Sequence, residues 1–362
     1  MKIVLFGLNG RGGMLHYTSQ YANALSKKVD VYVILPSYSD TSLFDSSVKL
    51  IKINAPLSVV RTLFSSINII QHLQLIRTIN ELNPSIVQFM DNHPWYLPYV
   101  YMLKRYKIFV TQHDPQLHSG EARGIRSFLI SITNKVLRNK ADRVIVHGEG
   151  LKKVLLKYGV SDRKILVVPH GDYSFFTKYS LPNIRTEPYT ILQFGRIVKY
   201  KGVDTLLKAI PLVKKKIPLI KVIIAGEGDF SPYRQYLTKD IKENVKIINR
   251  YVPDEEVAEL FQKCSFVVLP YDDATQSGPL HVAYSFKKPV IVTDVGCLPE
   301  VVDDGKTGLI IKPKDPEILA EAIISMFHKD LKAMGENGYI KMKELMNWDK
   351  IADIILVSLK RL

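Results

Sequence analysis

Short apolar runs recur along this chain and alternate with longer stretches in which apolar residues return every three or four positions. Runs such as 2–6 (KIVLF) and 266–269 (FVVL) have the length and continuous hydrophobicity of strands buried on both faces. The stretch that begins at Val203 has the periodicity of a helix with one buried face. The alternation predicts parallel βαβ units. The expected strands are 2–6, 30–35, 85–89, 108–112, 142–146, 165–168, 190–194, 220–225, 245–249, 266–269, 289–292 and 308–311.

The chain has 362 residues, enough for two domains that each bury a substantial core. The segment 171–187 is polar, aromatic and proline-bearing, which is typical of a linker. We therefore predict an α/β protein with two Rossmann-like doubly wound domains, at residues 1–172 and 188–345. A last amphipathic helix is expected within residues 346–362.

The net charge of +15 is unevenly distributed. Residues 1–180 carry +12 and residues 181–362 carry +3. A basic half can favour nucleic acid, anionic lipid or another anionic partner, but no nucleic-acid motif accompanies it here. The segments 59–77 and 125–143 mix bulky apolar and basic residues, which fits either core helices with a solvated basic face or a patch that meets a membrane.

The two cysteines, Cys264 and Cys297, match no metal-binding spacing and fit a reducing compartment. No apolar run reaches the roughly 20 residues of a spanning helix. The opening residues read as a first strand better than as a signal peptide. The expected location is the cytoplasm, with peripheral attachment to a membrane as an option.

The most informative stretch is 265–302. An apolar strand ends at Pro270, a polar loop leads to Ser277 and Gly278, and a short helix with Pro279 in its first turn follows. This places a helix N-terminus at the carboxyl edge of a parallel sheet, where α/β proteins bind phosphate. An ordinary crossover with a turn of small residues explains the same pattern.

This stretch resembles the glycosyltransferases of family four, which have the GT-B fold. The matching residues are Lys288-Pro289-Val290, the turn 296–300 (GCLPE), and Gly195-Arg196 followed by Lys201-Gly202. The family's paired glutamates would fall near Ala274 and on Val282, so the chain resembles a variant without them. The resemblance further implies that the last helix crosses back to the first domain.

The resemblance implies a site for the donor diphosphate in the second domain. Breaking a sugar–diphosphate bond leaves negative charge on the departing group, and a positioned Arg196 and Lys201 would stabilise it without a metal ion. Two basic residues beside a glycine are also common in solvated turns. The donor-binding residues implied by the resemblance are Gly12, Gly13, Gly195, Gly226, Gly228, Gln276, Ser277, Gly278 and Pro279.

In the first domain, His113 follows the strand 108–112, and the family places a histidine beside the donor sugar at the corresponding point. A role as a cap for the next turn is the alternative. The glycine loop 7–13 does not have dinucleotide-binding spacing, and it resembles the family's Gly-Gly loop or a plain tight turn. Weaker candidates for acceptor contacts are Asp91, His93, Asp114 and Arg123.

The implied activity is transfer of a sugar from a UDP- or GDP-linked donor to a hydroxyl of a glycan or lipid-linked glycan, with retention of configuration. No cofactor beyond the nucleotide sugar and no metal site is expected. A nucleotide-sugar epimerase and a non-catalytic GT-B partner of a transferase are the alternatives.

Overall fold

The computed structural model describes residues 1–55, 68–116 and 124–360. The chain forms two compact units. Unit 1 comprises Met1–Leu117, Glu121–Gly171 and Asn347–Leu362, and most of unit 2 is Asp172–Met346. The last helix, α13 (Trp348–Lys360), therefore belongs to unit 1, as the crossing-back of the C-terminal helix requires.

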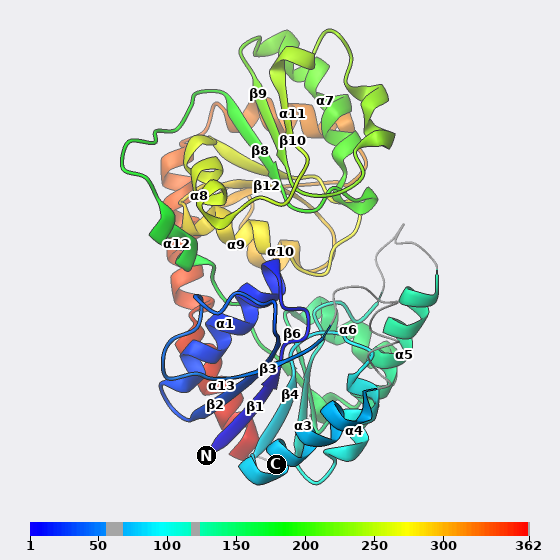
Figure 1. The fold of residues 1–362 in the computed structure, drawn as a ribbon. Coiled ribbons are helices and arrows are strands. Elements are labelled where there is room, and N and C mark those ends of the chain that lie inside the picture. The colour runs from blue at the N-terminus through cyan, green and yellow to red at the C-terminus, as the bar shows by residue number, and fades with distance from the viewer. Residues whose placement is uncertain (56–67, 117–123, 361–362) are drawn as a thin grey trace. The chain divides into compact units, whose positions relative to one another are not determined.

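Unit 1 contains a seven-stranded sheet in the order β3-β2-β1-β4-β5-β6-β7 (Figure 1), and all of its neighbouring strands run parallel. The helices α1 (Gly12–Ser26) and α13 pack together. A second group of helices in contact consists of α3 (Ile69–Leu82), α4 (Tyr96–Met102) and α5 (Ile125–Lys140). Helix α6 (Glu149–Lys157) precedes β7. The strands are β1 (Lys2–Phe6), β2 (Asp30–Pro36), β3 (Lys49–Ile53), β4 (Ile86–Phe89), β5 (Lys107–Thr111), β6 (Arg143–Val146) and β7 (Ile165–Val167).

Unit 2 contains a six-stranded parallel sheet in the order β10-β9-β8-β11-β12-β13. Its strands are β8 (Thr190–Phe194), β9 (Lys221–Ala225), β10 (Val245–Ile248), β11 (Phe266–Leu269), β12 (Val290–Thr293) and β13 (Gly308–Ile311). Its helices are α7 (Val203–Lys216), α8 (Asp254–Lys263), α9 (Gly278–Ser285), α10 (Leu298–Val301), α11 (Pro316–Met326) and α12 (Leu331–Leu345).

Both sheets have the strand order of a doubly wound fold, so the predicted fold class is confirmed. In each sheet the direction of winding reverses at one place, between β1 and β4 in unit 1 and between β8 and β11 in unit 2. Ligands of open α/β sheets bind outside the carboxyl ends of the strands at such a reversal point. The loops after these four strands are therefore the places to look for a site.

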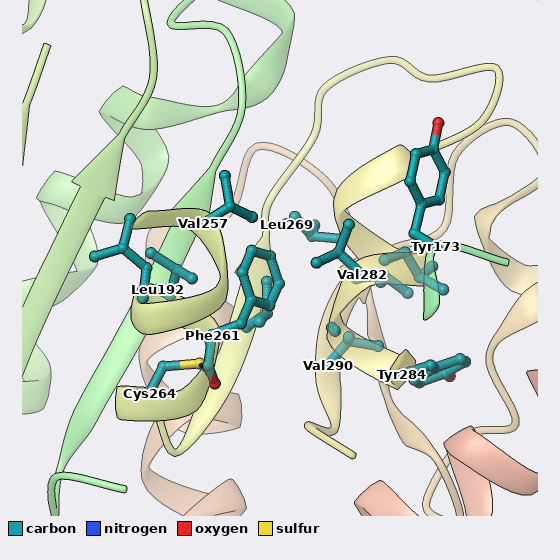
Figure 2. Close-up of a cluster of buried hydrophobic side chains, with 14 of the residues drawn as sticks. Tyr173, Leu192, Val257, Phe261, Cys264, Leu269, Val282, Tyr284 and Val290 are labelled. Carbon is teal, nitrogen blue, oxygen red and sulfur yellow. Dashed lines mark hydrogen bonds between the residues drawn. The ribbon is translucent and has the colours of Figure 1, made fainter. Parts of the chain in front are cut away.

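The hydrophobic core of unit 2 lies on both faces of its sheet because successive strand residues point to opposite sides. Leu192 packs into one cluster with α8 and α9, and its neighbour Ile191 packs into the other with α7 and α11. Figure 2 shows the first cluster, in which Phe261 lies between Val257 and Cys264. Burying one such large side chain contributes roughly 1.5–3 kcal/mol.

Some local predictions differ from the structure. β3 and α12 were not predicted, and both are mixtures of apolar and charged residues with weak periodicity. Helix α8 begins at Asp254, and its N-cap position is Pro253. Asp315 caps α11, since its Oδ1 accepts the amide N–H groups of Glu317 and Ile318, both at 3.0 Å.

Two ion pairs join helix α13 to the end of α1, and one close contact joins it to Gly171, which follows β7. Lys27 and Lys28 of unit 1 pair with Asp349 and Asp353 at 2.9 and 2.7 Å, but these pairs are largely exposed and each contributes about 0–1 kcal/mol. Trp348 is buried and lies so close to Gly171 that a Cβ atom there would overlap its indole ring. Residue 171 must therefore be a glycine.

We expect Gly171→Ala to destabilise unit 1 by about 1–3 kcal/mol because the added methyl group overpacks against Trp348. Thermal unfolding measures the loss. Gly124→Ala, whose Cβ would meet open space, is the matched control. Adding Trp348→Ala to Gly171→Ala should cost less than the two single losses together; full additivity would contradict the contact.

Candidate active site

In unit 2, glycines allow the loops after β8 and β9 to touch. Gly195 follows β8 with φ +120°, and its N–H donates to Ala225 O at 2.9 Å. A Cβ atom on Gly226 would overlap Gly195 O, and one on Gly228 would overlap Ile197 O. These three predicted donor-binding glycines thus bring two backbone segments together at the carboxyl edge of the sheet.

Lys201 reaches the same edge from a tight turn. The turn ends at Gly202, which has φ +66° and lies against Pro270 O so closely that a Cβ atom would overlap it. The side-chain amide of Gln193 donates to Lys201 O at 2.8 Å. The Lys201 ammonium then lies 3.7 Å from the ring centroid of Tyr271, which comes directly after Pro270 at the end of β11.

Arg196 lies on the loop after β8 and is exposed. Its Nη2 is 3.5 Å from the hydroxyl oxygen of Tyr200, a long contact that leaves the guanidinium at the surface of the loop. Arg196 and Lys201 therefore both belong to the segment that leads from β8 to α7. Each can present a positive charge at the reversal point of the sheet.

Helix α9 begins at this edge, as predicted. Ser277 is its N-cap residue and is buried, and Pro279 occupies the first turn. A Cβ atom on Gly195 would lie 3.5 Å from Cγ of Pro279, so the β8 loop and the start of α9 are neighbours. Gln276 is partly buried in the loop just before them. The positive end of the α9 dipole and the two cations lie at one edge of unit 2.

The two positions at which the family's glutamates would fall hold buried apolar side chains. Ala274 is 6% exposed and Val282 is 3% exposed, and both belong to the core cluster of Figure 2. Ala274 O also packs tightly against Gly296. Neither side chain can offer the carboxylate oxygens that a sugar or ribose hydroxyl would bind.

In unit 1, the glycine loop is held by a buried carboxylate. Asp91 follows β4 and is 3% exposed. Its Oδ2 accepts the amide N–H of Asn9 at 2.7 Å, and its Oδ1 accepts the hydroxyl of Tyr96 at 2.5 Å. Tyr96 also accepts the amide N–H of Leu8 at 3.0 Å. Asp91 therefore fixes the loop that leads to Gly12 and Gly13 in the first turn of α1.

The weaker acceptor candidates lie in different surroundings. His93 is 8% exposed, its Nδ1 accepts the amide N–H of Trp95 at 3.3 Å, and burial lowers its pKa to about 4. Asp114 is partly buried, and its backbone oxygen accepts the side-chain amide of Asn134 at 3.3 Å. Arg123 lies outside the described residues.

His113 belongs to a cluster of aromatic rings around Tyr17. The His113 ring meets the Tyr17 ring edge to face at 4.6 Å, and His113 Nε2 lies 3.1 Å from Met90 O, which accepts its proton. Burial lowers the pKa of His113. Among the described residues, the rings of His147, His170 and Trp348 also have their centroids within 5.3 Å of that of Tyr17.

The sequence signal for this cluster is the position of the histidines. His113, His147 and His170 each follow one of the neighbouring strands β5, β6 and β7, and parallel strands end at the same edge. Their convergence on Tyr17, which also contacts Trp348 of the last helix, was not predicted. Those two residues lie more than 300 positions apart, and no sequence periodicity links them.

A cavity of about 350 Å³ lies elsewhere, at the amino ends of the unit 1 strands. It is lined by residues that include Lys104, Arg105 and Asp142, and none of the predicted site residues borders it. Within the described ranges, no three His, Cys, Asp or Glu side chains are arranged to hold a metal ion. Among all the residues that the structure describes, no helix is long and apolar enough to cross a bilayer.

Two doubly wound parallel sheets, each with polar and basic loops at its reversal point, are the architecture of the GT-B fold of glycosyltransferases. Residues 11–171 match the family model "Glycosyltransferase Family 4", and residues 180–341 match "Glycosyl transferases group 1". The chain belongs to the glycosyltransferases of the family-four type.

The individual proteins that resemble this chain have low sequence identity to it. An uncharacterized glycosyltransferase of Methanocaldococcus jannaschii is 29% identical over 222 residues, which are 60% of this chain and 54% of the relative, so the chain spans about half of its length. The capsular polysaccharide biosynthesis glycosyltransferase CapM of Staphylococcus aureus is 21% identical over 92% of this chain and 91% of its own. The crystal structure of Anabaena HepE in complex with UDP has a TM-score of 0.74 at 16% identity and covers all of both chains.

The burial of Asp91 should make the stability of the folded state depend on pH. Desolvation raises the pKa of this carboxyl to about 6, above its ordinary value of 3.8, although the bonds from Tyr96 and Asn9 oppose the shift. The folded state thus holds the proton more tightly than the unfolded state. The stabilisation from this group is complete below about pH 4 and is lost as pH rises through about 6.

We therefore expect the free energy of unfolding of the wild type to fall, relative to Asp91→Asn, by roughly 3 kcal/mol between pH 4 and pH 7. Urea unfolding at several pH values measures the difference. A constant offset between the two proteins over this range would show that Asp91 is ionised throughout.

Proposed function

We propose that this protein is a glycosyltransferase that moves a sugar from a UDP- or GDP-linked donor to a hydroxyl group of a glycan or lipid-linked glycan. The observation that carries the proposal is the gathering of Lys201, Arg196 and the N-terminus of α9 at the reversal point of the unit 2 sheet. A site with two cations and a helix N-terminus suits a diphosphate, whose charge increases when the sugar departs.

Unit 1 would supply further substrate contacts. His113, fixed through Met90 O and the Tyr17 ring, would contact the donor sugar, and the loop with Gly12 and Gly13 would bind the donor by close approach of its backbone. Asp114 and Arg123 would contact the acceptor. Asp91 and His93 are buried supports in the structure, so an acceptor contact through them would need their hydrogen bonds to be exchanged.

The relatives support this class of chemistry. HepE was crystallised with UDP, and CapM is named for capsular polysaccharide biosynthesis. We propose that transfer occurs with retention of the anomeric configuration and without a metal ion, because Arg196 and Lys201 can balance the developing charge themselves. NMR analysis of the product anomer, and turnover in the presence of a chelator, test these two points.

A non-catalytic role is the second candidate, since Ala274 and Val282 occupy the positions of the usual glutamates. Calorimetric titration with UDP, GDP and their sugars, followed by assays of donor hydrolysis and transfer, separates the two. Binding without hydrolysis or transfer to any glycan acceptor would favour the non-catalytic partner, while isomerisation of the donor alone would indicate an epimerase.

We expect Arg196→Ala and Lys201→Ala each to reduce turnover by roughly 10²–10³, because each removes charge that balances the leaving diphosphate. Lys199→Ala is the matched control, since Lys199 is an exposed cation of the same segment and should keep near-normal turnover. Initial rates at saturating donor provide the measurement. Near-normal rates in both test variants would place the diphosphate elsewhere.

We also propose that unit 1 attaches to anionic membrane surfaces, which would bring a cytoplasmic enzyme to a lipid-linked acceptor. Ile69, Ile70 and Leu73 on α3 are 53–69% exposed, and Phe128 on α5 is 63% exposed. The segment 125–140 has basic residues and no acidic ones. Exposed apolar side chains beside positive charge suit the boundary between lipid headgroups and acyl chains.

In a vesicle sedimentation assay, the double variant Ile70→Ser, Phe128→Ser should bind anionic vesicles at least about tenfold more weakly, since burying each side chain contributes about 1.5–3 kcal/mol. Added salt should weaken wild-type binding. Leu219→Ser with Leu181→Ser, at exposed apolar positions of unit 2, is the control. Binding that is absent, or insensitive to salt, would contradict a membrane role.

A further inference from the structure

Tyr271 occupies a special place in unit 2. It follows β11 directly after Pro270, and β11 is one of the two strands that border the reversal point of the sheet. Its side chain is fully buried, although it lies in a loop. The backbone is fixed as well: the Tyr271 N–H donates to Leu269 O at 2.9 Å, and the Thr293 hydroxyl donates to Tyr271 O at 2.6 Å.

The two ends of this side chain contact two different parts of the proposed diphosphate site. The face of the ring lies 3.7 Å from Lys201 Nζ, within the range of a cation–π interaction. The hydroxyl oxygen lies 3.2 Å from Ser277 Oγ at the start of α9. Ser277 does not use its hydroxyl to cap the helix, so its contact with Tyr271 replaces the usual bond to the helix backbone.

We propose that Tyr271 is a positioning residue that holds Lys201 and the N-terminus of α9 in one fixed geometry for a nucleoside diphosphate. This inference rests on the proposed function, since the site that it organises is the proposed diphosphate site. Tyr271 itself touches no substrate. It acts through the ammonium group of Lys201 and through Ser277.

The physical reason is that lysine is a flexible ligand. Its four-carbon stem has several rotatable bonds, and fixing it at the moment of binding costs side-chain entropy. An aromatic face that already holds the ammonium group by a cation–π interaction reduces that cost. The second contact keeps the helix N-terminus at a constant distance from the same cation. Such preorganisation improves binding without adding a contact to the ligand.

A purely structural role is the competing explanation, because Tyr271 also belongs to the core cluster of Figure 2. Tyr284 offers a matched comparison within that cluster. It is equally buried, and its hydroxyl donates to Thr307 Oγ1 at 2.7 Å, but neither Lys201 nor Ser277 contacts it. Tyr284→Phe should therefore reproduce the loss of a buried hydroxyl bond without affecting the site.

The test is calorimetric titration with UDP and with GDP. Tyr271→Phe keeps the ring over Lys201 and should weaken binding by no more than about threefold. Tyr271→Leu removes both contacts and should weaken it about tenfold. Tyr284→Phe should leave the Kd unchanged. In a Lys201→Ala background, Tyr271→Leu should cost less than about threefold, because the cation that the ring holds is gone.

Equal costs of Tyr271→Leu with and without Lys201 would overturn the positioning role, as would a loss in Tyr284→Phe as large as that in Tyr271→Leu. A second readout does not depend on nucleotide binding. The Cε protons of Lys201 should show an upfield ring-current shift in NMR spectra, kept in Tyr271→Phe and reduced in Tyr271→Leu to the part due to the Tyr200 ring, whose centroid lies 5.3 Å from Lys201 Nζ. If the wild type binds neither nucleotide, the proposed function fails; an absent ring-current shift then rejects the positioning role, and a present one supports the Lys201–Tyr271 geometry.

Discussion

All strands in each sheet run in the same direction, and this constraint decides where chemistry can occur in the protein. The loops that follow the strands meet at one edge of the sheet. The two faces of the sheet are covered by core side chains, so they are not available to a substrate. At the point where the winding reverses, the helices before and after it cover opposite faces of the sheet, and two adjacent strand ends become available to a ligand. In unit 2, Lys201 and Tyr271 lie in the loops at this point, and in unit 1 the glycine loop and Asp91 do.

The two reversal points are built on the same principle but from different chemistry. In unit 2, glycines let backbone segments touch, so that a short chain segment can deliver two cations and a helix N-terminus to one edge. In unit 1, a buried carboxylate is accepted at the cost of desolvation because it fixes the amide of Asn9 and the hydroxyl of Tyr96. Both arrangements hold loops rigidly, which a transfer enzyme needs because small displacements of reacting groups reduce rates strongly.

The last helix links the far end of the chain to the candidate site of unit 1. Trp348 contacts both Gly171, at the end of the segment after β7, and Tyr17, which is surrounded by His113, His147 and His170. The exposed ion pairs of Lys27 and Lys28 with α13 add little energy, so the buried side chains of α13, which include Trp348, Ile351 and Ile355, provide most of the attachment.

The sequence alone was sufficient to predict the strands and helix starts, because these depend on interactions between residues that are close along the chain. Continuous apolar runs specify buried parallel strands, and proline and small polar residues specify helix starts such as that of α9, because these effects act within a few residues. The sequence also placed Arg196, Lys201 and Ser277 on loops at strand ends. Only the tertiary structure decided that Tyr271 joins Lys201 to Ser277, that Asp91 supports the glycine loop, and that Trp348 packs on Tyr17. These contacts form between segments that the fold alone brings together, and burial, which determines their energies and the pKa of Asp91, is a property of the whole packed unit.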